Sequence, residues 1–385
     1  MEPADGGEAR TGSRRDAAPL RVGVIGCGLV AQVMHLPYLR ELADRFSLDA
    51  ICDLSPTVLA AVGERFGVPK RFVRWQELLE TPLDAVVIAT PGSHAEAAIA
   101  AAQAGLHVFV EKPMCFSPAD GRAMIEAARS AGVTLMVGNM KRYDPAFARL
   151  AAELAATSDL RLVQVTTLEA PFRPYVEQYP LAVPADDVDA DGLAASRRAS
   201  DAALAEALPE AAEETRAVYQ AVLLDTLIHE LNLLRGLLGA PTAIRYATVT
   251  NRAATIALDF GAVPVELAWI DLPGITRYQQ ELVFYAPDRR LRLSFPSPFL
   301  RNAPTELVME GGAVGGPRSW ATREIVAYEE AFKLELIEFA DSIAQQRAPR
   351  TTAADGLADV ELCVEIIRAM GSPGPARRLE PAAAV

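Results

Sequence analysis

A histidine and an aspartate on one predicted helix could carry out proton transfer. The chain has four histidines, and only His229 lies in its second half. Asp225 precedes His229 by four residues, so both side chains should project from one face of an α-helix. An imidazole titrates near neutrality and can take up or release a proton at physiological pH. The pair is a candidate acid–base site, and the alternative is a half-buried histidine with a purely structural role.

A glycine-rich turn near the N-terminus is suited to phosphate. Gly26 opens the run Gly-Cys-Gly-Leu-Val-Ala, which follows an apolar strand pattern and begins a helical one. In a G-x-G-x-x-A turn, Gly26 permits the tight bend and Gly28 lets the backbone approach a pyrophosphate. The N–H groups at the helix start, which include Leu29 and Val30, would then hold the phosphates. Asp53 ends the next predicted strand and is placed to bind the adenosine ribose, or else to cap the following helix.

The residues after Asp53 bear on the choice of dinucleotide. No arginine or lysine occurs between Leu54 and Gly63. A 2′-phosphate usually needs a nearby cation. The sequence therefore favours NAD over NADP.

Strand and helix patterns alternate through the first part of the chain. Near-continuous valine, isoleucine and leucine runs are typical of parallel strands buried on both faces. Strands are expected at 20–25, 47–52, 84–90, 107–110 and 133–137, and helices at 29–45, 56–66, 93–104 and 119–131. This alternation predicts a doubly wound parallel sheet, in a dinucleotide-binding domain of residues 19–145.

The pattern changes after residue 145. Helices are expected at 146–156, 217–238, 324–346 and 354–370, and strands at 160–168, 243–249, 255–260, 263–270, 278–285 and 290–295. Successive strands joined by short turns favour antiparallel pairing. Residues 146–385 are therefore predicted to form an α+β domain with an open, mostly antiparallel sheet, interrupted by a polar insertion at about 171–214.

Composition narrows the class of protein. A formal net charge of −13 argues against a nucleic-acid surface, which needs clustered cations. Four cysteines without C-x-x-C spacing argue against a disulfide framework or a metal site and fit a reducing cytoplasm. No apolar run is long enough to span a membrane, and residues 1–18 are predicted to be a disordered tail.

Two further motifs carry a resemblance to a known family. Residues 90–94 read Thr-Pro-Gly-Ser-His, and residues 105–113 read Gly-Leu-His-Val-Phe-Val-Glu-Lys-Pro. Together they resemble the Gfo/Idh/MocA oxidoreductases, the type of glucose–fructose oxidoreductase and inositol dehydrogenase. The resemblance covers the whole first domain and implies a Rossmann fold that binds a nicotinamide dinucleotide.

The resemblance implies roles for the residues of both motifs. Pro113 would follow a cis peptide bond beside the nicotinamide, and Lys112 would reach the substrate hydroxyl and the nicotinamide ribose. The other side chains implied to line the cofactor are Thr90, Pro91, His94, Glu111 and Arg142. For His94 the alternative is a helix cap. Lys141 or Arg142 would reach the cofactor carboxamide or the substrate, and the alternative for each is an interdomain salt bridge.

The resemblance extends to the long helix of the second domain. Residues 225–232 resemble the family's D-x-x-x-H-x-x-D pattern, which implies that His229 is the general acid–base and Asp225 its electrostatic partner. Oxidising a secondary alcohol removes a hydride from carbon and a proton from oxygen, and a cationic Lys112 would polarise that oxygen. We therefore expect an NAD(P)-dependent dehydrogenase or ketoreductase acting on a sugar, sugar derivative or cyclitol. The expected substrate contacts come from Lys112, Tyr143, Tyr175, Asp225 and His229.

Two features depart from the family pattern. Asn232 stands where a second acidic residue is usual, so an amide replaces a carboxylate that would orient sugar hydroxyls. The insertion at 171–214 is either a solvated surface segment or a lid over the substrate, with Tyr175 and Tyr179 stacking on it.

Two other functions stay open. An enzyme that retains NAD and cleaves a glycoside through transient oxidation would make no net NADH. A dinucleotide-binding sensor would regulate a partner, but it has no need of Lys112, Asp225 and His229 together. The resemblance also implies a homodimer or homotetramer formed through the free face of the second sheet.

Overall fold

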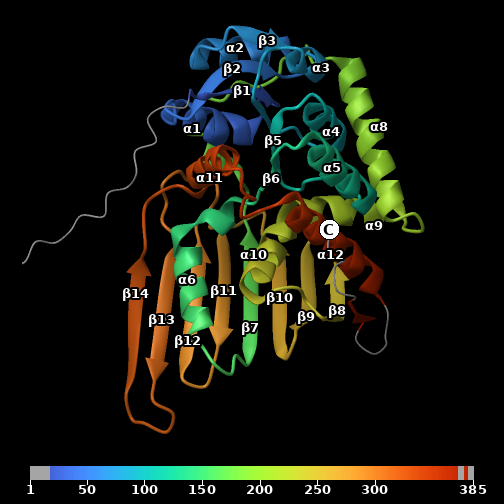
Figure 1. Ribbon diagram of the computed structural model, residues 1–385. Helices are drawn as coiled ribbons and strands as arrows, with labels where there is room; N and C mark the ends of the chain where they lie inside the picture. The colour runs from blue at the N-terminus through green and yellow to red at the C-terminus, as the bar shows by residue number, and fades with distance from the viewer. Residues whose placement is uncertain (1–17, 372–376, 380–385) are drawn as a thin grey trace, which may run out of the picture.

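Two sheets build the molecule, one above the other in Figure 1. The computed structural model describes residues 18–371 and 377–379. The predicted tail of residues 1–18 therefore lies almost entirely outside the described residues. The first sheet has six parallel strands in the order β3-β2-β1-β4-β5-β6. The second has nine strands in the order β14-β13-β12-β11-β7-β10-β9-β8-β15, of which only β7 and β10 pair in parallel. Both parts of the predicted fold class are confirmed.

Short buried strands and covering helices make up the first domain. Its strands are β1 (Leu20–Ile25), β2 (Phe46–Cys52), β3 (Lys70–Phe72), β4 (Ala85–Ile88), β5 (His107–Glu111) and β6 (Leu135–Gly138). Its helices are the π-helix η1 (Ala31–His35), α1 (Leu36–Glu41), α2 (Pro56–Phe66), α3 (Trp75–Leu79), α4 (Ala95–Gln103) and α5 (Pro118–Ala131). All four residues of β4 are buried, as a sheet covered on both faces requires.

The second domain holds the longer sheet. Its strands are β7 (Leu162–Glu169), β8 (Ala243–Val249), β9 (Ala253–Phe260), β10 (Val263–Asp271), β11 (Gln279–Tyr285), β12 (Arg289–Phe295), β13 (Glu306–Gly312), β14 (Ser319–Ile325) and β15 (Arg377–Arg378). Its helical segments are η2 (Met140–Tyr143), α6 (Pro145–Ala155), α7 (Arg173–Val176), α8 (Ala190–Ala207), α9 (Glu213–Val218), the π-helix η3 (Tyr219–Leu227), α10 (Ile228–Leu238), α11 (Ala331–Gln345) and α12 (Ala353–Ala369). None of the helices just given is long and apolar enough to cross a membrane.

Some predicted elements were wrong. The helix expected at 324–346 begins only at Ala331, because 319–325 pair with β13 as an edge strand. Almost every residue of that strand is exposed, so it lacks the apolar alternation that signals a strand. The helix expected at 29–45 ends at Glu41. Strands β3 and β13 and helix α3 were not predicted.

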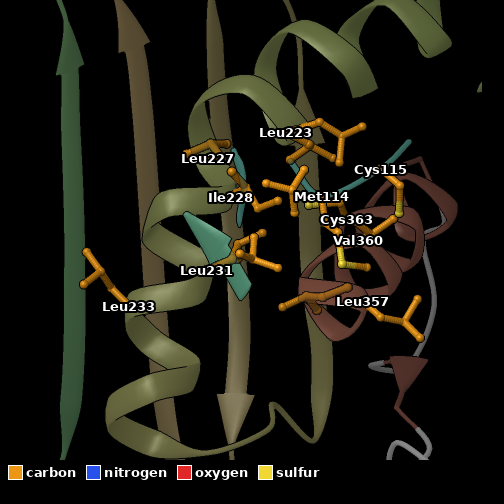
Figure 2. Packing of buried hydrophobic residues seen from close by; sticks show 14 of the residues in the cluster. Met114, Cys115, Leu223, Leu227, Ile228, Leu231, Leu233, Leu357, Val360 and Cys363 are labelled. Carbon is orange, nitrogen blue, oxygen red and sulfur yellow. The ribbon is translucent and has the colours of Figure 1, made fainter. Parts of the chain in front are cut away.

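The two closing helices pack across both domains. In α11, Phe339 stacks edge-on against Phe109 of β5, and Asp341 pairs with Arg45 at 2.6 Å. Helix α12 packs beside η3 and α10: Leu357 and Cys363 lie with Leu223 in one apolar group (Figure 2). Helix α12 therefore holds the long η3–α10 helix in place, and α11 packs on the first domain. The proposed domain boundary at 145/146 stays a prediction.

Candidate active site

The phosphate turn lies at the reversal point of the first sheet. Strands β1 and β4 are neighbours there, and the carboxyl ends of strands at such a point are where dinucleotides bind. Gly26 has φ +93°, and a Cβ on it would lie 2.7 Å from the Thr90 nitrogen, so only glycine fits. Gly28 is exposed, and a Cβ there would meet nothing within 4 Å. The turn is thus open to a phosphate, and Leu29 and Val30 follow it half-buried at the helix start.

Asp53 is fixed beside this turn. Its carboxylate accepts hydrogen bonds from the Cys27 nitrogen at 2.9 Å and the Ser55 nitrogen at 3.0 Å. The cap of α2 is Ser55, whose hydroxyl accepts from the Val58 nitrogen at 3.2 Å. Asp53 is half-buried at the end of β2, which is the place a ribose-binding carboxylate needs.

His94 ties two loops together. Its Nδ1 lies 2.8 Å from the Pro113 oxygen and its Nε2 lies 2.7 Å from the Thr90 oxygen. The ring is buried, and burial lowers its pKa. Both ring nitrogens face main-chain oxygens, and the neutral ring donates to one of them. The side chain makes no capping hydrogen bond to α4, and the expected cofactor contact stays a prediction. This link between the two loops positions the half-buried Thr90 and the exposed Pro91 at the carboxyl edge.

Buried contacts of Glu111 hold the Glu-Lys-Pro motif in place. The peptide bond between Lys112 and Pro113 is cis, as the resemblance implied. Glu111 turns inward: its carboxylate lies 2.6 Å from His35 Nε2 and also accepts from the Lys112 nitrogen at 3.1 Å. Its contacts hold the backbone of Lys112, so the structure assigns it a supporting place and not the cofactor contact that was expected.

The buried carboxyl group of Glu335 lies beside the Glu111–His35 pair. Ligand-type atoms of His35, Glu111 and Glu335 lie within 4.8 Å of one another. Glu335 is fully buried, and burial followed by the charge of Glu111 raises its pKa well above the usual range. We infer that Glu335 is protonated at neutral pH, which avoids two adjacent buried negative charges.

Lys112 meets the long helix of the second domain. Its Nζ donates to the main-chain oxygen of Asp225 at 2.6 Å and lies 3.3 Å from the Asp225 carboxylate. Asp225 sits in the π-helix η3, a type of helical irregularity that often marks functional sites. The Lys112 side chain is 17% exposed and that of Asp225 76%. The structure therefore pairs Asp225 with Lys112, whereas the sequence suggested a pairing with His229.

Packing holds Lys112 and the helix in register. The loop after the cis bond contributes Met114 and Cys115 to the same buried apolar cluster as Leu223 and Ile228, and Figure 2 shows Met114 next to Ile228. Leu233, further along the helix, points instead toward the strands of the second sheet. The buried Tyr219 hydroxyl donates to the Phe116 oxygen at 2.9 Å. These contacts fix the helix that carries His229 directly on the Glu-Lys-Pro loop.

His229 lies among cations. Burial, then Lys112, then Lys141 lower its pKa well below the usual range. The ring is therefore neutral at physiological pH and able to accept a proton. An oxygen that develops negative charge beside it would be stabilised by the two ammonium groups.

Lys141 belongs to a buried chain of hydrogen-bonded polar side chains, and the sequence pointed to none of its other members. Its Nζ donates to Gln280 Oε1, and Gln280 Nε2 donates to Glu230 Oε1 at 2.5 Å. Thr167 donates to the same Glu230 oxygen at 2.6 Å. Burial lowers the pKa of Lys141 to about 8, against the opposing effect of Glu230. One signal in the sequence could have revealed this chain: Gln280 and Thr167 are polar residues at inward-facing positions of otherwise apolar strands. The two residues are direct partners across β11 and β7.

Other expected residues point elsewhere. Tyr143 is 4% exposed, and its hydroxyl bonds Thr351 Oγ1 at 2.8 Å, so it is a core residue and not a substrate contact. Arg142 donates to the main-chain oxygen of Asn232 at 3.3 Å and pairs with Asp355 at 3.5 Å. These contacts match the salt-bridge alternative, and cofactor binding by Arg142 stays a prediction.

Asn232 is also directed away from the site. It is 2% exposed, and its Nδ2 donates to Asp359 at 2.7 Å and to Asp355 at 3.1 Å. Both carboxylates belong to α12, on the side of α10 that faces this helix. In this fold the amide does not stand in for a substrate-orienting carboxylate.

Tyr175 pins the insertion near the site. Its hydroxyl donates to the Thr276 oxygen and accepts from the Tyr278 nitrogen at 2.8 Å. The ring of Tyr278 lies 5.8 Å from Lys141 Nζ. Tyr175 is thus one contact removed from the polar chain, and its role toward a substrate stays a prediction.

These features define a two-domain protein. The carboxyl edge of its parallel sheet carries a turn suited to a dinucleotide, and Lys112 and the neutral His229 belong to the same site. Residues 20–139 match the family described as "Oxidoreductase family, NAD-binding Rossmann fold", the Gfo/Idh/MocA family. The predicted family is confirmed: residues 20–139 are a Gfo/Idh/MocA NAD-binding domain.

Relatives with assigned names resemble the first domain. Myo-inositol 2-dehydrogenase of Thermotoga maritima is 38% identical over 133 residues, which cover 34% of this chain and 39% of the relative. Levoglucosan dehydrogenase of Pseudarthrobacter phenanthrenivorans is 33% identical over 137 residues, which cover 34% of this chain and 35% of the relative. The similarity thus spans little more than a third of these relatives' length.

Solved structures extend the likeness to the whole fold. A levoglucosan dehydrogenase in complex with NADH matches with a TM-score of 0.72 and 18% identity, covering 94% of this chain and 99% of that one. A 3-ketoreductase of Actinomadura kijaniata in complex with NADP matches with a TM-score of 0.69 and 20% identity, covering 91% and 98%. At these identities the likeness establishes the fold alone.

Proposed function

We propose that the protein is an NAD-dependent oxidoreductase acting on a secondary alcohol or ketone of a sugar, sugar derivative or cyclitol. The observation that carries the proposal is the placement of Lys112. Its Nζ lies 2.6 Å from the Asp225 oxygen at the edge that also holds the phosphate turn, and its charge contributes to lowering the pKa of His229, four residues further along the same helix. Relatives of the first domain named as sugar and inositol dehydrogenases support the substrate class.

The first domain would hold the dinucleotide. The open turn at Gly28 would receive the pyrophosphate, and Asp53 would bind the adenosine ribose. Thr90, Pro91 and Pro113 would border the nicotinamide, and the bound cofactor would supply hydride transfer at that end. The absence of cations from Leu54 to Gly63 supports NAD over NADP.

The second domain would handle the proton. His229 takes the hydroxyl proton of an alcohol in the oxidative direction and returns it to oxygen in the reductive one. The Lys112 ammonium group has three N–H donors, and two of them are directed at Asp225. The third would donate to the reacting oxygen and stabilise its negative charge. Asp225 holds the ammonium group in that position. These roles make Lys112, Asp225 and His229 the proposed catalytic and substrate-binding set.

The test is the absorbance of reduced nicotinamide. Purified protein would be mixed with NAD and a panel of sugars, amino sugars and cyclitols, beside a His229→Ala variant. Formation of NADH that falls at least about 100-fold in the variant is expected if the histidine is the base. Glycoside cleavage without net NADH would contradict the proposal and favour transient oxidation with retained NAD.

We also propose that the protein is a homodimer or homotetramer. The free face of the second sheet would form the interface, and exposed aromatic side chains lie on two of its strands, Tyr246 on β8 and Trp320 on β14. Light scattering that gives a monomer mass at all concentrations would contradict this.

A further inference from the structure

A segment of the insertion runs along the carboxyl edge of the first sheet. We call residues 180–200 the strap. Its start is tied to the helix after the phosphate turn: the Ala182 oxygen accepts from Gln32 Nε2 and its nitrogen donates to Gln32 Oε1, both at 2.8 Å. Its end is tied to the loop after β4, where the Ser93 nitrogen donates to Ser200 Oγ at 3.2 Å. Figure 1 shows α8, which contains Ser200, lying alongside the first domain.

The middle of the strap meets the loop that follows Asp53. The Asp189 nitrogen donates to the Leu54 oxygen at 2.8 Å. Asp187 places its carboxylate at the start of α2: one oxygen accepts from Ser55 Oγ and the other from the Thr57 nitrogen, both at 2.7 Å. These hydrogen bonds, from Thr57 first and then Ser55, lower the pKa of Asp187 below its usual range. A full negative charge is therefore fixed at this helix start.

This is the position an additional phosphate would need. A 2′-phosphate projects from the ribose that the residue at the end of β2 binds. The nearest anion-binding groups are the N–H groups and the hydroxyl at the start of α2, an eleven-residue helix. Asp187 already occupies both the Ser55 hydroxyl and the Thr57 nitrogen, and no cation from Leu54 to Gly63 offsets its charge.

We propose that Asp187, reaching over from the second domain, is the residue that excludes NADP from the cofactor site. The inference rests on the proposed dinucleotide binding. It gives the insertion a role at the adenosine end of the cofactor, whereas the sequence left open a solvated surface segment or a lid over the substrate. Discrimination then comes from repulsion of the wrong ligand as well as attraction of the right one.

The test compares two neighbouring aspartates. NADH and NADPH affinities would be measured by fluorescence titration, without substrate, for wild type, Asp187→Asn and Asp186→Asn. Asp186 is exposed in the same segment, so its variant removes the same charge and serves as the matched control. Asparagine at 187 keeps an oxygen that can accept from Thr57, and unchanged NADH affinity reports a folded site.

The expected result is selective. Asp187→Asn should strengthen NADPH binding by ~10-fold or more and change NADH binding little, while Asp186→Asn changes neither. Equal NADH-to-NADPH ratios in the two variants and the wild type would overturn the inference alone. Failure of all three proteins to bind either nucleotide would overturn the proposed function and the inference with it.

Discussion

Replacing Asn232 by aspartate tests the packing of α10 against α12, and it also tests whether residue 232 faces the substrate. The substitution restores the acidic residue usual in the family at this position. In this structure Asn232 Nδ2 donates to Asp359 at 2.7 Å and to Asp355 at 3.1 Å. Arg235 pairs with both carboxylates, and Arg142 pairs with Asp355. Two cations therefore balance two anions, and a third carboxylate leaves the cluster with an excess negative charge.

The magnitude follows from these distances. Two unit charges about 4 Å apart repel by ~4 kcal/mol at an effective dielectric constant near 20. The attraction of the nearby guanidinium groups offsets part of this, and two hydrogen bonds are lost. We expect Asn232→Asp to cost roughly 3–5 kcal/mol at about pH 8, which lowers Tm by on the order of 10 °C.

The cost should depend on pH. Burial raises the pKa of Asp359 to about 7 in the wild type. The added carboxylate would raise it further, so the folded variant takes up a proton as the pH falls. The destabilisation is thus present above the raised pKa and shrinks toward about pH 5.

Thermal unfolding at the two pH values measures this, with Asn232→Ala as the control. The alanine variant loses hydrogen bonds without adding charge, so it should cost ~1–3 kcal/mol with little pH dependence. An aspartate variant equally stable at both pH values would refute the electrostatic reasoning. A variant that folds normally but changes substrate affinity would show that this side chain faces the substrate after all.

Four other predictions follow from the structure. Lys141→Met removes one of the cations that lower the pKa of His229, so the acidic limb of kcat/KM should move to higher pH, while Lys141→Arg leaves it in place. Gly28→Ala should fold within ~0.5 kcal/mol of wild type yet bind NADH ~10-fold more weakly, because its Cβ enters open space where phosphate would lie. Gly26→Ala, by contrast, should cost ~1–3 kcal/mol in a denaturation experiment, since a Cβ at φ +93° meets backbone at 2.7 Å. Burial raises the pKa of Glu335 well above its usual range, so its contribution to stability is present at acidic pH and is lost as the pH rises through that raised pKa. Glu335→Gln should flatten that decline in thermal unfolding.

Local patterns made the first domain predictable. The turn at Gly26, the strand ending at Asp53 and the spacing of the following helix all depend on residues close in sequence. The Glu-Lys-Pro motif and its cis bond were likewise readable, since a proline after a strand end in this family context has a defined geometry.

Contacts between distant residues were not predictable. The bond from Ser55 to Asp187 joins positions 132 apart, and nothing in the polar insertion signals which surface it will meet. Edge strand β14 was not predicted, and its last two residues were assigned to the following helix, because its exposed residues show no period-two pattern. Tyr143 was misplaced because a turn between domains gives no sequence cue for which way its side chain faces.

Deuterium transfer from substrate to nucleotide reports the proposed hydride step itself. An active substrate from the panel, deuterated at the carbon that bears the reacting hydroxyl, would be incubated with the protein and NAD, and the nucleotide analysed by mass spectrometry. We expect monodeuterated NADH in an amount equal to the ketone formed, and none with His229→Ala. Unlabelled nucleotide with the deuterium retained in a cleaved or unchanged sugar would contradict the proposed hydride step.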